Sequence, residues 1–195
     1  LIRIKPEFKK SQRDRVLTLD EVRQIWFAAE ALSPAHTAAV RTLLLLPFRK
    51  EELLSCSWSE LEEGWLNVPA QRAKTSEASS LFVSPFAATQ FPSRRNDSEL
   101  IFTTNGVVPT RLGSKVKSKL DSALGLQNWV FHDFRRTFST HMHETNQPHF
   151  MIEACINHRD GTRQGVAGVY NRAEYRNQKQ AVLQQWSDMV EAAVG

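Results

Sequence analysis

The stretch HDFRR, from His132 to Arg136, opens a segment whose apolar residues recur every three or four positions. On a helix, that spacing places them on one stripe suited to face a core. The stripe consists of Phe131, Phe134, Phe138 and Met142. A second stripe beside it carries His132, Arg135 and Ser139. A histidine and an arginine one turn apart, held against a buried face, form a rigid pair that can grip an anion such as a phosphate. A helix-end histidine and a surface arginine without a ligand have the same spacing. This segment alone therefore does not distinguish an anion-binding pair from ordinary surface residues.

The composition indicates one globular domain. With 195 residues, 41% of them hydrophobic, the chain can bury a full core. It has no apolar run near the roughly 20 residues that span a bilayer, and its first residues lack the apolar core of a signal peptide. We therefore expect a cytoplasmic protein with no membrane partner. Cys56 and Cys155 are too few for a disulfide framework and are expected to be small buried residues.

The N-terminal residues are basic. Residues 1–16 show little apolar periodicity and are expected to form a leader or linker, with residues 17–195 as the folded domain. A basic segment and a net charge of +4 are compatible with a polyanionic partner such as DNA.

Two helices are expected next. Thr18 and Glu21 have the spacing of a capping box, which predicts a helix from about 19 to 31. A second helix is expected to begin after Pro34 and to stop at Pro47. The following residues then lie at a tight junction between buried helices.

Arg49 occupies that junction, just before the helix-compatible run KEELLSCSWSEL. An arginine at a helix N-terminus gains nothing from the helix dipole. A charge placed against local preference often has a specific partner. Here the partner is either a nearby carboxylate such as Glu52 or the anion of a ligand.

The middle of the chain reads as a small sheet followed by a helix. Short strands are expected at 65–68 and 81–83, joined by the polar segment QRAKTSEASS with Lys74 near its tip. A lysine at such a tip is either a solvated charge or part of a site. Pro109 is expected to start a helix with its leucine and valine residues four apart, namely Leu112, Val116, Leu120 and Leu124.

The C-terminal part is expected to hold two helices separated by a loop. A short helix should follow Pro148 and end at Asn157 and His158. The glycines of RDGTRQGVAG weaken any regular element just before Tyr170. Residues 178–193 have the apolar spacing of a terminal amphipathic helix.

Four segments in this order resemble the catalytic domain of tyrosine recombinases, the phage integrase family. They are LLLLPFRKEELLSCSWSEL, VPAQRAKTSEASSLFVSP, HDFRRTFSTH and INHRDGTRQGVAGVYNRAEY. The resemblance covers nearly the whole chain, and the YNRAEY ending looks most like integrases of prophages and genomic islands. Type IB topoisomerases share the tyrosine chemistry, but the arrangement from INH to YNR favours a recombinase. The resemblance implies a mainly helical α+β fold with a small antiparallel sheet.

The resemblance also implies a catalytic set, consisting of Arg49, Lys74, His132, Arg135, His158 and Tyr170. Tyr170 would attack the scissile phosphate and form a 3′-phosphotyrosyl bond. The two arginines would clamp the phosphate oxygens, and Lys74 would protonate the departing 5′ oxygen. His132 would exchange a proton with the tyrosine, and His158 would hydrogen-bond the phosphate.

Chemistry alone supports such a set. Breaking a phosphodiester without a metal needs a nucleophile, cations for the developing charge, and an acid for the leaving oxygen. A free tyrosine has a pKa of about 10, so attack at neutral pH needs a base and a positive field. The six residues supply each of these functions, and no cofactor or metal is expected.

The chain departs from the family pattern at three places. The first arginine is usually preceded by Thr-Gly, whereas Pro47 and Phe48 precede Arg49 here. The glycine that starts the last histidine motif is replaced by Asn157. A second tyrosine, Tyr175, lies five residues after the one that the motif selects.

Family analogy extends to partners and missing parts. The expected partners are double-stranded DNA attachment sites, further copies in a homo-tetramer on DNA, and an accessory directionality factor. No N-terminal core-binding or arm-binding domain is evident, so a fragment is expected. The terminal helix would pack either within its own chain or on a neighbour. The main alternative of another class is a catalytically inactive DNA-binding module of the same fold.

A zinc site is an alternative, because His141, His143, His149, Cys155 and His158 crowd one region. The first two point to different helix faces, and the cysteine and last histidine form a lone pair without a second matched pair. The sequence therefore predicts no metal site.

Overall fold

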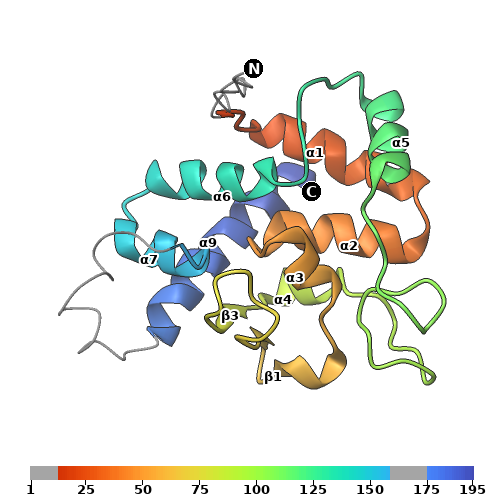
Figure 1. The fold of residues 1–195 in the computed structure, drawn as a ribbon. Coiled ribbons are helices and arrows are strands. Elements are labelled where there is room, and N and C mark those ends of the chain that lie inside the picture. The colour runs from red at the N-terminus through yellow and green to blue at the C-terminus, as the bar shows by residue number, and fades with distance from the viewer. Residues whose placement is uncertain (1–12, 159–174) are drawn as a thin grey trace, which may run out of the picture.

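The computed structural model describes residues 13–158 and 175–195. They form a mainly helical domain with one small sheet, which confirms the predicted fold class (Figure 1). The helices are α1 (Leu19–Ala28), α2 (Pro34–Leu45), α3 (Lys50–Leu54), α4 (Pro85–Ala88), α5 (Ser114–Leu124), α6 (Asp133–His143), α7 (His149–Cys155) and α9 (Arg176–Val194). Short 3-10 turns, η1 (Ala29–Ala31) and η2 (Trp58–Glu60), accompany them. The strands are β1 (Leu61–Glu62), β2 (Trp65–Val68) and β3 (Ser79–Phe82).

The first two helices begin where their capping signals predict. The Thr18 hydroxyl accepts the Glu21 amide, and the Glu21 carboxylate accepts the Thr18 amide, so the capping box is present. Together α1 and η1 cover the predicted range. Pro34 stands at the first turn of α2, and the chain leaves that helix just before Pro47. The apolar residues near the end of α2 are buried, so the next segment is anchored against the core.

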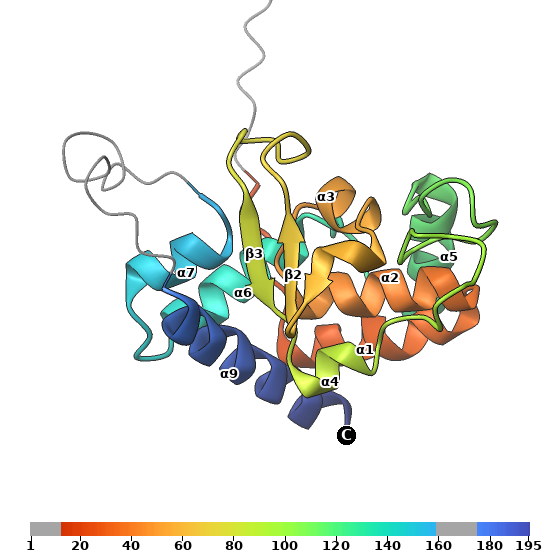
Figure 2. The ribbon, with the colours of Figure 1, turned by 90° about the horizontal axis from the view of Figure 1, so that it is seen from below.

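The sheet is antiparallel in the order β1-β2-β3. Trp65 pairs with Phe82 and Val68 with Ser79, so β3 begins two residues earlier than predicted. The hairpin between β2 and β3 carries Lys74, as the sequence indicates. In Figure 2 the sheet stands near the centre of the view, with α7 on one side and α5 on the other, and α9 passes beside β3.

Two predicted helix boundaries were wrong because non-local pairing competes with the helix. The run after Arg49 is helical only to Leu54, since the Cys56 carbonyl accepts the Ile101 amide and Trp58 donates its amide to Glu99. The helix expected from Pro109 begins at Ser114. Pro109 itself bridges to Thr103, and the Thr110 amide donates to the Phe102 carbonyl. Because residues 109–110 pair with residues 102–103, α5 begins further along the chain than predicted.

Helices α6 and α9 agree with prediction and complete the core. The predicted stripe is buried, with Phe134, Phe138 and Met142 on α6 and Phe131 just before it. Helix α9 packs its apolar face on α1, α7 and β3 of its own chain (Figure 1). Both cysteines are buried, as expected. Among the described residues, no helix is long and apolar enough to cross a membrane.

Trp186 ties α9 to the rest of the core. Its side chain is fully buried, its indole N–H donates to the Leu44 carbonyl at 2.9 Å, and its ring meets Phe138 edge-on. We expect Trp186→Ala to lower the free energy of unfolding by about 3–5 kcal/mol, because it removes a large core side chain and leaves a cavity. Urea denaturation followed by circular dichroism measures this. The matched control is Phe27→Ala, since Phe27 is 42% exposed. A loss below about 1 kcal/mol for Trp186→Ala would mean that α9 is not part of the core.

Candidate active site

Arg135 lies at the centre of the candidate site. It is only 8% exposed, on the polar stripe of α6 next to the buried aromatic stripe. One terminal nitrogen donates to the Pro47 carbonyl at 2.5 Å, and the other donates to the Ile156 carbonyl. Burial, reinforced by neighbouring Arg49, lowers the pKa of Arg135 to about 10, so the group stays charged at neutral pH. A guanidinium carries more N–H donors than these two contacts use, so it can also bind an anion.

Arg49 is held by a buried carboxylate. It precedes α3, and its guanidinium donates to Glu52 Oε1 at 3.1 Å. Its backbone amide donates to Oε2 of the same residue at 3.2 Å. Glu52 is only 4% exposed, one turn along α3, so the carboxylate partner foreseen from the sequence is present. The arginine side chain keeps 19% exposure, which leaves its outer nitrogens able to meet a ligand.

The same carboxylate also positions the hairpin. The backbone amide of Lys74 donates to Glu52 Oε1 at 3.0 Å. This contact joins residues far apart in the sequence and places the lysine next to the arginine. Lys74 is exposed, so its ammonium reaches solvent at the site. Glu52 therefore connects two of the predicted catalytic residues.

His132 stands at the N-terminal end of α6, and the next residue anchors it. Asp133 is fully buried and accepts bonds from Arg13, Arg136 and the Val130 amide. Partial burial, and then the nearby arginines, lower the pKa of His132. The imidazole is therefore neutral at pH 7 and can accept a proton.

His158 follows α7 and is oriented by Glu153. Its Nδ1 donates to the Glu153 carboxylate at 2.6 Å, so Nε2 is the nitrogen presented to a ligand. Asn157 has a φ of +44°, a conformation that favours glycine but that asparagine tolerates. This explains how asparagine replaces the family's glycine. The side-chain amide of Asn157 also donates to the Thr75 hydroxyl and to the Glu77 carbonyl. These bonds join this segment to the Lys74 hairpin.

One cleft of about 590 Å³ gathers five of the six predicted residues. They are Arg49, Lys74, His132, Arg135 and His158. They come from the residue before α3, the β2–β3 hairpin, the start of α6 and the residues after α7, so the fold brings distant motifs together. The sixth, Tyr170, lies outside the described residues, as does the glycine-containing loop before it. The other tyrosine, Tyr175, packs its ring against Phe150 with 5.9 Å between centroids.

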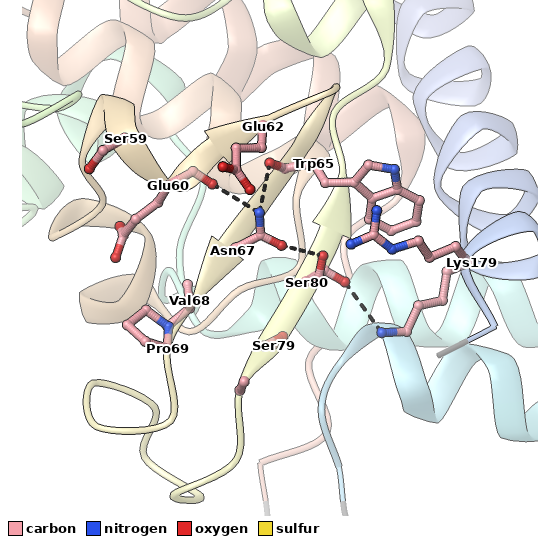
Figure 3. A pocket seen from close by; sticks show the side chains of 12 residues that line it. Ser59, Glu60, Glu62, Trp65, Asn67, Val68, Pro69, Ser79, Ser80 and Lys179 are labelled. Atoms are coloured by element: carbon pink, nitrogen blue, oxygen red, sulfur yellow. Dashed lines mark hydrogen bonds between the residues drawn. The ribbon is translucent and has the colours of Figure 1, made fainter. Parts of the chain in front are cut away.

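A second hollow of similar size, about 540 Å³, lies on the sheet and has a different character. Figure 3 shows Asn67 and Ser80 bonded to each other across neighbouring strands, with Lys179 bonded to the Ser80 carbonyl. The Arg176 guanidinium lies over the Trp65 ring at 5.2 Å. None of the five predicted residues that the structure describes lines this hollow, so the first cleft is the candidate site.

Several residues that line the cleft lie outside the predicted set, among them Glu153 and Arg136. Glu153 lies five residues before His158, on the buried face of α7. Arg136, the last residue of HDFRR, also lines the cleft, and its partner is Asp133. A buried acidic residue within two turns of a predicted cationic one is the signal that could have identified Glu153.

The sequence profile of the Phage integrase family matches residues 15–176. Among curated relatives, Prophage integrase IntZ of Escherichia coli (strain K12) is 29% identical in an alignment of 195 positions, which covers 90% of this chain. The chain spans only 45% of that relative's length.

Two solved structures share the fold. A lambda integrase dimer bound to a COC′ core site matches with a TM-score of 0.63 at 20% identity, over 86% of this chain and 64% of that one. A lambda integrase tetramer bound to a Holliday junction matches with a TM-score of 0.63 at 20% identity, over 80% of this chain and 50% of that one. With most of its length matched by the family profile and its fold shared with these integrases, the chain belongs to the phage integrase family of tyrosine recombinases.

Proposed function

We propose that this chain is the catalytic part of a site-specific DNA recombinase that cleaves and rejoins DNA through a 3′-phosphotyrosyl intermediate. The observation that carries the proposal is the single cleft that gathers Arg49, Lys74, His132, Arg135 and His158. The set combines two guanidiniums that can bind an anion, a lysine that can act as a general acid, and a neutral imidazole that can act as a general base. Phosphoryl transfer by positioning and charge stabilisation needs this combination.

In the proposed first step, the Tyr170 hydroxyl oxygen attacks the scissile phosphorus. A new P–O bond to tyrosine forms as the bond to the 5′ oxygen breaks. The phenolic proton passes to His132, and Lys74 gives a proton to the leaving 5′ oxygen. Exchange of one phosphodiester for another conserves the bond energy, so the reverse attack by a 5′ hydroxyl rejoins a strand.

The two arginines act on the phosphate itself. Arg135 is fixed by its two carbonyl contacts and Arg49 by Glu52, so both are in place before the substrate arrives. Preorganised donors of this kind stabilise charge that develops in the transition state. His158, with Nδ1 bonded to Glu153, would contribute through Nε2.

Partners follow from the same proposal. One matched lambda integrase structure is bound to a core site and another is a tetramer on a Holliday junction, so we propose duplex DNA and a tetramer of this protein as the working assembly. The relative named a prophage integrase supports integration or excision of a mobile element. An accessory directionality factor, a cytoplasmic location and a boundary between a leader at 1–16 and the catalytic domain stay predictions.

The direct test uses nicked duplex DNA that carries the element's own attachment site and traps the covalent intermediate. The full-length enzyme and its Tyr170→Phe variant are mixed with this substrate and run on a denaturing gel. We expect a protein–DNA band with the parent enzyme that disappears in the variant and does not require a divalent metal. DNA binding without any covalent band would favour the catalytically inactive DNA-binding module instead.

Glu52→Gln tests the carboxylate under the cleft. The amide keeps the shape of the side chain but loses the charge that holds Arg49, and it presents N–H donors toward the arginine and the Lys74 amide. We expect single-turnover cleavage to fall about ten- to a hundredfold, the usual effect of misplacing catalytic groups. The matched control is Glu51→Gln on the same helix, because Glu51 is 79% exposed and its partner is Lys50. Equal rates for the two variants would contradict this role of Glu52.

The pH dependence tests His132 as the base. Because its pKa is lowered from the ordinary value of 6.5, the ring is neutral and active above that pH and becomes protonated only at more acidic pH. We expect the cleavage rate to fall as pH decreases, with the midpoint of this limb below 6.5. Single-turnover rates between about pH 5 and pH 8 measure it. His132→Asn should be slow and should lack this limb, and a midpoint above 6.5 in the parent enzyme would contradict the assignment.

A further inference from the structure

Two histidines beside the cleft, which the proposed chemistry does not use, form a cluster with Glu153, the carboxylate that orients His158. His143 is the last residue of α6, and His149 and Glu153 lie one turn apart on α7. One ligand atom from each, an imidazole nitrogen or a carboxylate oxygen, lies within 4.8 Å of the others. Such closeness depends on the sharp turn between α6 and α7, which brings the end of one helix onto the start of the next.

The hydrogen bonds of the cluster define the protonation of His143. Its Nδ1 lies 2.6 Å from the Ser139 carbonyl oxygen, which can only accept, so Nδ1 carries a proton. In the neutral ring Nε2 then holds a lone pair, and it lies 2.6 Å from Nδ1 of His149. The two nitrogens share one proton at this distance. A cation that binds to both lone pairs can replace that proton.

The donor set matches a transition metal. Neutral imidazoles and a carboxylate are common ligands of Zn²⁺, and a ligating histidine usually donates its other N–H to a carbonyl, as His143 does. Both histidines are exposed, so an ion can enter from solvent, whereas Glu153 is buried and supplies the negative charge. We propose that His143, His149 and Glu153 bind a divalent transition-metal ion of the zinc class.

This proposal differs from the expectation drawn from the sequence, and the reason is geometric. That expectation weighed the histidines with Cys155, which is buried and is not part of the cluster. His141 is also directed elsewhere, since its Nε2 bonds the Leu17 carbonyl and its ring lies tilted against that of Trp186, with 5.9 Å between centroids. The third ligand is instead Glu153, which only the turn between the helices brings to His143.

The site adjoins the proposed chemistry through Glu153. One oxygen of this carboxylate accepts the Nδ1 proton of His158. A carboxylate has two oxygens, so it can bind a metal ion with one and keep the histidine with the other. A bound ion would then fix the α6–α7 turn and the carboxylate that orients His158.

Zinc binding to the protein alone tests the proposal without any recombination assay. Untagged protein is stripped with a chelator and titrated with Zn²⁺ in a weakly coordinating buffer by isothermal titration calorimetry. We expect one site per chain and a rise in the melting temperature with zinc. His143→Gln and His149→Gln should each weaken binding at least tenfold and abolish the zinc-dependent rise. His36→Gln, at a histidine on α2 outside the cluster, should bind like the parent.

The melting temperatures of the metal-free proteins show whether each variant still folds. Both cluster histidines are exposed, so their variants should melt at the parent temperature without zinc. Glu153→Gln should also weaken zinc binding at least tenfold. Zinc affinity that is unchanged in all three variants, or no binding by the parent, would overturn the proposal. Either result would leave the proposed recombination chemistry intact, because no step of it passes through the ion.

Discussion

The buried guanidinium of Arg135 is the interaction on which the site depends. It donates to the carbonyl of Pro47, two residues before Arg49, and to the carbonyl of Ile156, two residues before His158. One side chain on α6 therefore fixes the chain at the end of α2 and at the end of α7. Both carbonyls belong to residues that leave a helix, where backbone oxygens lack helical partners. The arginine satisfies these oxygens and in doing so sets the spacing of the other cationic groups.

Gathering several cations in one cleft is unfavourable unless carboxylates offset their repulsion. Glu52, Asp133 and Glu153 do so from beneath, and all three are buried. Each one is bonded to a cationic or polar group of the cleft rather than standing open to solvent, so the positive side faces outward. A site arranged in this way attracts an anion while its own charges remain paired on the inner side. Burial, and then the nearby Arg136 and Arg135, lower the pKa of His132, although Asp133 acts in the opposite direction.

The core explains why the site is rigid. The aromatic stripe of α6 is buried against the domain, so the neighbouring polar stripe has a fixed orientation. Trp186 of α9 contacts both Phe138 of α6 and the end of α2. The C-terminal helix, although distant in sequence, therefore supports the two elements that carry the arginines.

Sequence alone determined the helices with strong periodicity or capping signals, the hairpin, the order of the family motifs and five residues that the fold then placed in one cleft. Local signals and side-chain patterns specify these, because each depends on residues a few positions apart. Sequence could not determine where α3 ends or where α5 begins, since pairing with distant segments decides both. The contact of Glu52 with Lys74 and the closeness of Glu153 to His143 likewise exist only after folding. Such contacts join segments whose proximity depends on packing, so no local pattern in the chain encodes them.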